Sequence, residues 1–147
     1  MNPSPIIHIP RIESTPLDIG NHLPLTFICG PCQLESRGHA LETAEFLRDV
    51  FKRAGAGFIY KTSFDKANRS SIKSYRGPGL KDGLAMLTEV KKQLNVPIAT
   101  DIHEVDQAAP VAAVADDLGG VAECGGDRHE ARGNAVGNGV RKALAVS

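Results

Sequence analysis

The chain has 147 residues, which is enough for one domain with a hydrophobic core. Lys plus Arg and Asp plus Glu each number 17, so the net charge is zero and lacks the basic excess of nucleic-acid-binding or membrane-surface proteins. The sequence has no apolar run near the ~20 residues of a membrane span and no signal-peptide pattern at its start, and three irregularly spaced cysteines do not form a disulfide framework. We therefore expect a cytoplasmic protein with neither membrane nor nucleic acid as partner.

The first predicted elements are a small hairpin and a buried strand. Residues 6–12 and 15–20 can pair as the hairpin. Pro24 then precedes LTFIC, whose β-branched and aromatic residues are typical of a buried strand.

Two helices are predicted from the spacing of apolar residues and from residues that favour the ends of helices. Ser36 begins the first, which carries apolar residues at helical spacing and stops at the glycines near position 55. Gly79 opens the second, with a stripe of leucines and a valine along one face, and Asn95 ends it.

Two more strands and a third helix complete the pattern. The segment GFIYKTSF, which starts at Gly57, is the second strand, and Pro97 starts the third, PIATDIH. A third helix is predicted from about Val105 to Ala115. Three strand–helix units in succession predict an α/β fold with parallel strands and right-handed crossovers.

Chemically reactive side chains follow each of these strands. Cys32 follows the first strand, Lys61 and Ser63 end the second, and Asp101 and His103 end the third. Because functional groups in such folds gather at the carboxyl edge of the sheet, we expect these five side chains to share one edge.

The segment from Lys61 to Leu80, KTSFDKANRSSIKSYRGPGL, is the most informative part of the chain. Five cations stand in it among serines, an asparagine and glycines. Lys supplies a point charge and Arg a forked pair of donors, so together they can hold phosphate and carboxylate groups in fixed orientation. The segment predicts a phosphorylated, multiply charged substrate, although a solvated basic loop would have a similar composition.

Several of these residues also have purely structural explanations. Cys32 could be a buried thiol, and Cys29 is interpreted as core. His103 could satisfy a neighbouring backbone carbonyl, and Asp101 could cap the following helix.

The end of the chain departs from the pattern. From Asp117 onward it is rich in Gly and Ala, and no strand-like run stands where a fourth strand should begin. We therefore divide the chain into residues 1–116, which carry the fold, and 117–147, an irregular tail expected to be poorly ordered because it can bury little apolar surface.

Four stretches together resemble a known family: FICGPCQLES, KTSFDKANRSS, SYRGPGLKDGL and PIATDIHEVDQAAPVA. From about Ile6 to Asp116 the chain is similar to the N-terminal part of the 3-deoxy-D-manno-octulosonate 8-phosphate synthases, also called 2-dehydro-3-deoxyphosphooctonate aldolases, of the class I DAHP synthase-like family. KANRSS separates them from the related synthases of a seven-carbon acid phosphate, which resemble the chain at GPC but have a Lys-Pro-Arg-Thr-type loop.

The resemblance implies a fold and a reaction. The fold is a hairpin followed by a (β/α)8 TIM barrel, here with about three βα units and therefore incomplete. The reaction is a transferase condensation of phosphoenolpyruvate with D-arabinose 5-phosphate, which releases phosphate and serves lipopolysaccharide (Kdo) biosynthesis. Members assemble as tetramers.

The resemblance also implies roles for residues that match the family motifs. Lys61 and Ser63 match contacts to phosphoenolpyruvate, and Lys66 matches a lysine between the two substrates, so Lys61 and Lys66 are the predicted catalytic residues. Cys32 matches the metal ligand of the metal-dependent subclass, and a thiolate suits a divalent ion of borderline softness.

The sugar side of the predicted site comes from the same motifs. Asn68 and Asp101 match contacts to the sugar. Arg69 and Ser70 match groups that bind the sugar phosphate across a subunit interface.

The family's remaining phosphate and metal ligands lie in later strands, and nothing in the tail matches them. A closed barrel needs about 250 residues. We therefore expect a truncated reading frame, produced by a frameshift, whose product is weakly active or inactive and binds no metal. Two alternatives stay open: a seven-carbon DAHP synthase-type aldolase, and a non-catalytic remnant that binds a phosphorylated ligand.

Overall fold

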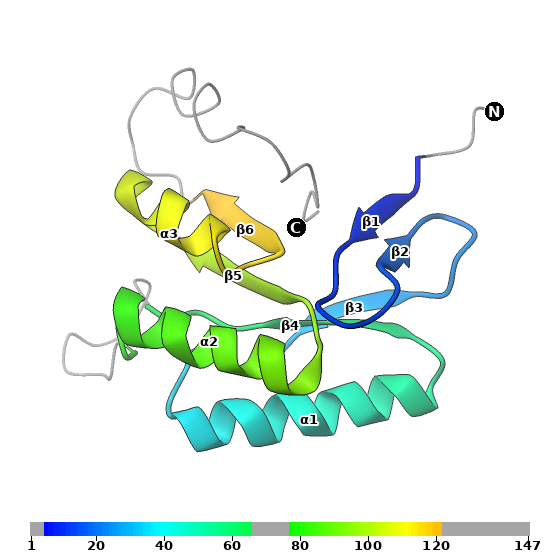
Figure 1. The fold of residues 1–147 in the computed structure, drawn as a ribbon, viewed down its shortest axis with the longest axis horizontal. Helices are drawn as coiled ribbons and strands as arrows, with labels where there is room; N and C mark the ends of the chain where they lie inside the picture. The colour runs from blue at the N-terminus through cyan, green and yellow to red at the C-terminus, as the bar shows by residue number, and fades with distance from the viewer. Residues whose placement is uncertain (1–4, 66–76, 122–147) are drawn as a thin grey trace.

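The computed structural model describes residues 5–65 and 77–121. Its elements, drawn in Figure 1, are β1 (Ile7–Ile9), β2 (Leu17–Ile19), β3 (Thr26–Cys29), α1 (Arg37–Arg53), β4 (Gly57–Lys61), α2 (Leu80–Leu94), β5 (Ile98–Ile102), the 3-10 turn η1 (Val105–Gln107), α3 (Ala108–Ala112) and β6 (Asp117–Val121). No helix of this described part is long and apolar enough to cross a membrane.

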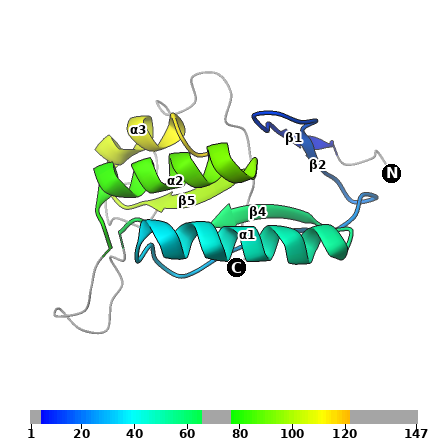
Figure 2. The ribbon, with the colours of Figure 1, turned by 60° about the horizontal axis from the view of Figure 1, so that its bottom comes forward.

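The strands β3, β4, β5 and β6 form one parallel sheet in that order. The helices α1 and α2 lie side by side along the sheet (Figures 1 and 2). The predicted α/β fold, a hairpin followed by the βα units of an incomplete barrel, is therefore confirmed.

The hairpin β1–β2 covers the end of the sheet where the strands begin. Its strands pair antiparallel, as predicted, with His8 opposite Asp18. Ile9 and Leu17 pack with Ile59 of β4 and Ala99 of β5 in a small apolar cluster. This cluster lies on the face of the sheet that points away from the helices.

The ends of the two long helices follow their sequence signals. The Ser36 hydroxyl accepts a hydrogen bond from the His39 backbone N–H at 3.2 Å and caps α1. Gly79, at φ +83°, precedes α2, and Asn95, at φ +51°, ends it in the left-handed region that Asn tolerates better than most residues. The predicted helix bounds are thus confirmed.

The main core lies between the helices and the sheet. Its fully buried side chains include Tyr60, Phe64, Leu87, Ile98 and Val111. Tyr60 lies on the helix-facing side of β4, and Ile98 lies on the helix-facing side of β5. In each strand, the residues next to them in sequence therefore point to the other face of the sheet. That alternation decides which side chains reach the functional edge.

The predicted third helix is wrong in its extent. The segment from Val105 forms one 3-10 turn, and the α-helix α3 begins only at Ala108. Pro110 explains the break, because a continuous helix from Val105 would need an N–H at Pro110 to bond the carbonyl of residue 106. In α3 the proline falls in the first turn, where no such donor is required.

The expectation that no strand follows Asp116 is also wrong. Residues 117–121 form β6, which pairs in parallel with β5 and places Thr100 opposite Leu118. DLGGV contains two glycines and has little strand propensity of its own, so non-local pairing with β5 determines its conformation. Residues 122–147, the rest of the predicted tail, lie outside the described part, so the division at position 116 stays a prediction.

Candidate active site

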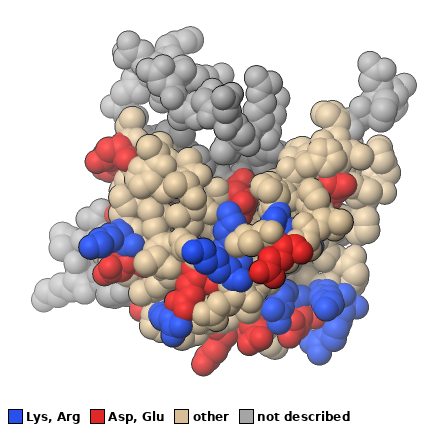
Figure 3. Space-filling view, viewed as in Figure 1, with Lys and Arg blue, Asp and Glu red and all other residues tan. Residues whose placement is uncertain are grey.

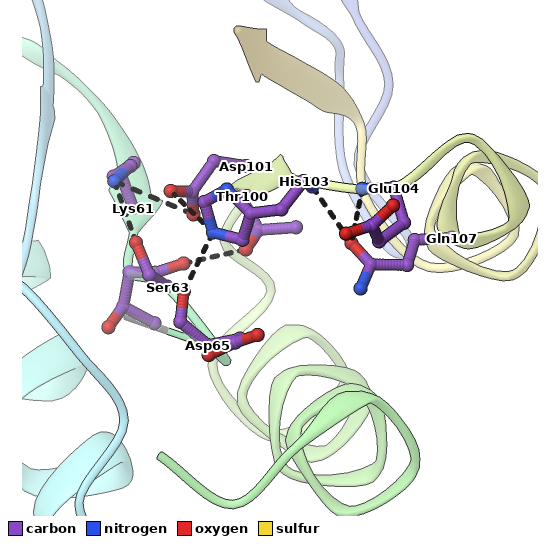
Figure 4. A network of polar contacts seen from close by, with 9 residues as sticks. Lys61, Ser63, Asp65, Thr100, Asp101, His103, Glu104 and Gln107 are labelled. Atoms are coloured by element: carbon purple, nitrogen blue, oxygen red, sulfur yellow. Dashed lines mark hydrogen bonds and ion pairs between the residues drawn. The ribbon is translucent and has the colours of Figure 1, made fainter. Parts of the chain in front are cut away.

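Three predicted site residues share one face at the carboxyl edge of the sheet. The parallel register pairs Lys61 with Ala99, so Ser63 is level with Asp101 two residues further along. Lys61, Ser63 and Asp101 therefore lie on the face opposite the helices, beyond the apolar layer of Ile59 and Ala99 (Figure 4).

The polar groups of this edge are in close contact. The Lys61 Nζ donates a hydrogen bond to the Ser63 Oγ at 3.2 Å. The Asp101 Oδ1 lies 3.9 Å from the same nitrogen. This oxygen is buried and accepts no hydrogen bond within the described part of the chain, whereas the Lys61 side chain remains 35% exposed.

The His103 side chain connects the end of β5 to the chain that follows β4. Its Nε2 lies 2.7 Å from the backbone carbonyl oxygen of Asp65 and 3.6 Å from the Asp101 Oδ2. A carbonyl oxygen can only accept, so the Nε2 carries the proton. The structural explanation predicted for His103, satisfaction of a backbone carbonyl, is confirmed.

Two buried threonines support the edge, and the sequence analysis missed them. The Thr100 hydroxyl donates to the Thr62 carbonyl oxygen at 2.8 Å and thereby links β5 to the chain after β4. Both side chains are fully buried. The signal was present: Thr62 directly follows Lys61 and Thr100 directly precedes Asp101, so alternation turns both threonines to the opposite face.

The Gln107 side chain also went unnoticed. Its Oε1 accepts hydrogen bonds from the backbone N–H of His103 at 2.8 Å and of Glu104 at 3.2 Å. Glu104 caps the turn η1, so the alternative in which Asp101 caps the following helix is wrong. A Glu followed three residues later by Gln was the available signal.

The loop that carries Cys32 packs against the end of β4. A Cβ on Gly30 would lie 2.1 Å from the Lys61 carbonyl oxygen, so only glycine fits there. The backbone N–H of Leu34 donates to the Ser63 carbonyl oxygen at 2.9 Å. Cys32 thus belongs to the same edge, although the contacts that join Lys61, Ser63 and Asp101 do not include it.

The two described cysteines differ in environment. Cys32 is exposed, so the alternative of a buried structural thiol is wrong. Cys29 packs against the main core as interpreted, and burial raises the pKa of its thiol. Within residues 5–65 and 77–121 no three His, Cys, Asp or Glu side chains gather in a way that could hold a metal ion. Cys32 as a metal ligand therefore stays a prediction.

Four further predicted site residues, Lys66, Asn68, Arg69 and Ser70, lie outside the described part. What the described edge offers is one ammonium group, one hydroxyl and one carboxylate oxygen without a donor. This set suits a ligand that carries both negative charge and hydroxyl groups.

Comparison with known proteins identifies the family. The model of the DAHP synthetase I family matches residues 9–120, which include most of β6. The chain is 56% identical over 101 residues to a 2-dehydro-3-deoxyphosphooctonate aldolase of Bordetella bronchiseptica, covering 69% of this chain and 35% of that protein. It is 48% identical over 118 residues to the protein of the same name from Rhodopseudomonas palustris, covering 80% and 41%.

A third relative with this name, from Caulobacter vibrioides, is 46% identical over 114 residues, covering 78% of this chain and 40% of its own length. The chain thus spans 35–41% of the length of these curated relatives. The family match begins at the end of β1 and extends over β2, the βα units and the polar edge, and the chain belongs to the DAHP synthetase I family.

Proposed function

We propose that this chain supplies a substrate-binding edge for the condensation of phosphoenolpyruvate with D-arabinose 5-phosphate to 3-deoxy-D-manno-octulosonate 8-phosphate and phosphate. The observation that carries the proposal is the placement of Lys61, Ser63 and Asp101 on one face, just before the segment KANRSS. The names of the relatives support this choice of reaction. A role in lipopolysaccharide synthesis in the cytoplasm and assembly as a tetramer belong to the same proposal.

Lys61 is proposed to bind phosphoenolpyruvate. An ammonium group has three N–H donors, and in the described part of the chain one of them is used on Ser63. The others can donate to the phosphate or carboxylate of the ligand, since a third of the side chain is exposed. Ser63 fixes the direction of the ammonium group and can itself contact the ligand.

Asp101 is proposed to bind the sugar. Its buried Oδ1 lacks a donor within the described residues, and leaving such an oxygen unsatisfied costs about 1–3 kcal/mol. A sugar hydroxyl would supply the missing donor. Lys66 is proposed to lie between the substrates, Asn68 to contact the sugar, and Arg69 and Ser70 to bind its phosphate.

The reaction joins C3 of the enol phosphate to the aldehyde carbon of the sugar, after which water adds at C2 and phosphate leaves. These protein groups hold two anions side by side and stabilise the charge that develops, which is a task of positioning and electrostatics. Among the described residues, no group of three metal-ligating side chains surrounds Cys32.

Calorimetric titration of the full chain with phosphoenolpyruvate tests the binding step. The substitution Lys61→Met should weaken binding about ten- to a hundredfold, because it removes a charge-assisted hydrogen-bond donor. Lys81→Met, an exposed residue at the start of α2, is the matched control and should bind like the parent. Equal affinities of parent and Lys61→Met would contradict the proposed role.

The choice of sugar is tested separately. Binding of arabinose 5-phosphate should exceed that of erythrose 4-phosphate, and the reverse order would favour the seven-carbon reaction. Release of phosphate with both substrates present measures turnover. Binding of both substrates without turnover would mean that the chain is a phospho-ligand-binding fragment.

A further inference from the structure

A second charged region lies at the opposite end of the sheet from the Lys61 edge. A cavity of about 530 Å³ opens there between the end of α1, the end of α2 and the chain after the hairpin strand β1. Pockets of this size hold small organic ligands. Figure 3 shows Lys and Arg side chains gathered over the C-terminal end of α1.

The charge of the cavity lining is mainly positive. Three cations, Arg11, Arg48 and Lys52, face one carboxylate, Asp49. Arg48 is partly neutralised, because its Nε donates to the Asp49 Oδ1 at 2.9 Å and its Nη2 lies 3.4 Å from Glu45. The same contact lowers the pKa of Asp49. Arg11 and Lys52 are therefore the main sources of unbalanced positive charge.

Arg11 gives independent evidence for a ligand. Its Nε is buried and has no hydrogen-bond acceptor in the described part of the chain. Burying a guanidinium N–H without an acceptor is costly, so such a group usually has an acceptor, which an anionic ligand would supply here. Lining residues beside it, among them Phe58, Val96 and Pro97, are apolar and buried and can contact a carbon skeleton.

The backbone beside Arg11 is held in place. The Asn95 Oδ1 accepts hydrogen bonds from the backbone N–H of Ile12 at 3.1 Å and of Glu13 at 3.2 Å, and its Nδ2 donates to the Ser14 hydroxyl at 3.1 Å. The segment after Arg11 is thus fixed to the end of α2, which reduces the entropy lost when the guanidinium orders around a ligand.

We propose that this cavity binds a small phosphate monoester, with its phosphate on Arg11 and Lys52 and its organic group against the apolar residues. The excess of two cations, three against one carboxylate, matches the charge of a phosphate dianion better than that of a monocarboxylate. The site is separate from the Lys61 edge and is independent of the proposed condensation.

Phenyl phosphate, inorganic phosphate and benzoate serve as probes in amide NMR titrations of the full chain. Phenyl phosphate should bind at least tenfold more tightly than benzoate and more tightly than inorganic phosphate. The shifted amides should cluster at Ala56, Asn95 and Val96 rather than at Ser63. Shifts confined to Ser63 and its neighbours, or equal binding of benzoate, would overturn the proposal.

Variants assign the binding to individual side chains. Arg11→Gln should weaken phenyl phosphate binding at least tenfold when the binding is measured from the Ala56, Asn95 and Val96 amides. Lys52→Gln, an exposed position, should weaken it several-fold and provides the test if Arg11→Gln does not fold. Lys81→Gln is the control for a lost surface charge. Unchanged affinity in both Lys52→Gln and a folded Arg11→Gln would refute the site.

Discussion

At the scale of single residues, alternation along two strands accounts for much of the candidate site. Lys61 and Ser63 are two apart, as are Asp101 and His103, and a parallel sheet brings such pairs to one face. The sequence therefore predicted the shared edge correctly. The partner of His103 could not be predicted as a specific atom, because a backbone carbonyl leaves no signature in the sequence.

Tyr60 leads to a prediction about stability at neutral pH. The side chain is fully buried and its hydroxyl has no hydrogen-bond partner in the described part of the chain. Tyr60→Phe removes this unsatisfied group and keeps the ring, so it should raise the free energy of unfolding by about 1 kcal/mol at pH 7. Urea denaturation measures the change, and a loss of 1 kcal/mol or more would reveal a partner for the hydroxyl.

The raised pKa of Tyr60 also leads to a prediction of how the free energy of unfolding falls in alkaline solution. Burial raises the pKa of Tyr60 from 10.0 to about 12, so between these values the unfolded chain loses the phenolic proton first. The parent should therefore lose on the order of 2–3 kcal/mol relative to Tyr60→Phe as the pH rises through this range. Titration by tyrosinate absorbance checks that Tyr60 is the group with the raised pKa. The ionisation step at the higher pH should vanish in Tyr60→Phe and persist in Tyr75→Phe, which removes the other tyrosine.

At the scale of elements, the capping residues predicted the helices well and composition predicted β6 poorly. Ser36, Gly79 and Asn95 act through local backbone geometry, which the sequence records directly. β6 depends instead on hydrogen bonds to β5, whose partners lie 18 residues away at Ala99 and Asp117. Local propensity carries little information about such pairing.

Asn95 is predicted to stabilise the fold through its side-chain hydrogen bonds and through its tolerance of a left-handed backbone conformation. Asn95→Gly removes the bonds to Ile12, Glu13 and Ser14 but relieves the left-handed φ of 51°, and it should cost about 1–2 kcal/mol of unfolding free energy. Asn95→Ala loses the same bonds and also pays about 1 kcal/mol for the backbone conformation. Denaturant unfolding of both variants measures the difference.

The control for this pair is Ser14→Ala, which removes one side-chain bond and should cost less than either Asn95 variant. If the Gly and Ala variants were equally stable, the left-handed conformation would carry no measurable cost.

At the scale of the whole molecule, the open sheet has a chemically distinct edge. Within residues 5–65 and 77–121 only β4 pairs with β3, and the side chains of Leu25, Phe27 and Ile28 are 74%, 42% and 45% exposed. An unpaired strand with exposed apolar side chains is a template for pairing with another chain. The chain is therefore expected to self-associate through β3.

Ile28→Lys tests this expectation. The charged side chain would stand on the exposed face of an edge strand, where natural proteins place lysine to block pairing, so the association constant should fall at least tenfold. Because nearly half of Ile28 is already exposed, the folded monomer should lose only about 1 kcal/mol or less. Sedimentation velocity over a range of concentrations measures the association.

The matched control is Phe46→Lys, which introduces the same charge at a 66% exposed apolar residue of α1, away from any strand edge. A general loss of apolar surface would make both variants less prone to associate, whereas pairing along β3 predicts an effect of Ile28→Lys alone. If Phe46→Lys dissociated the assembly and Ile28→Lys did not, association would involve the helical face, and the exposed edge of β3 would not be the contact.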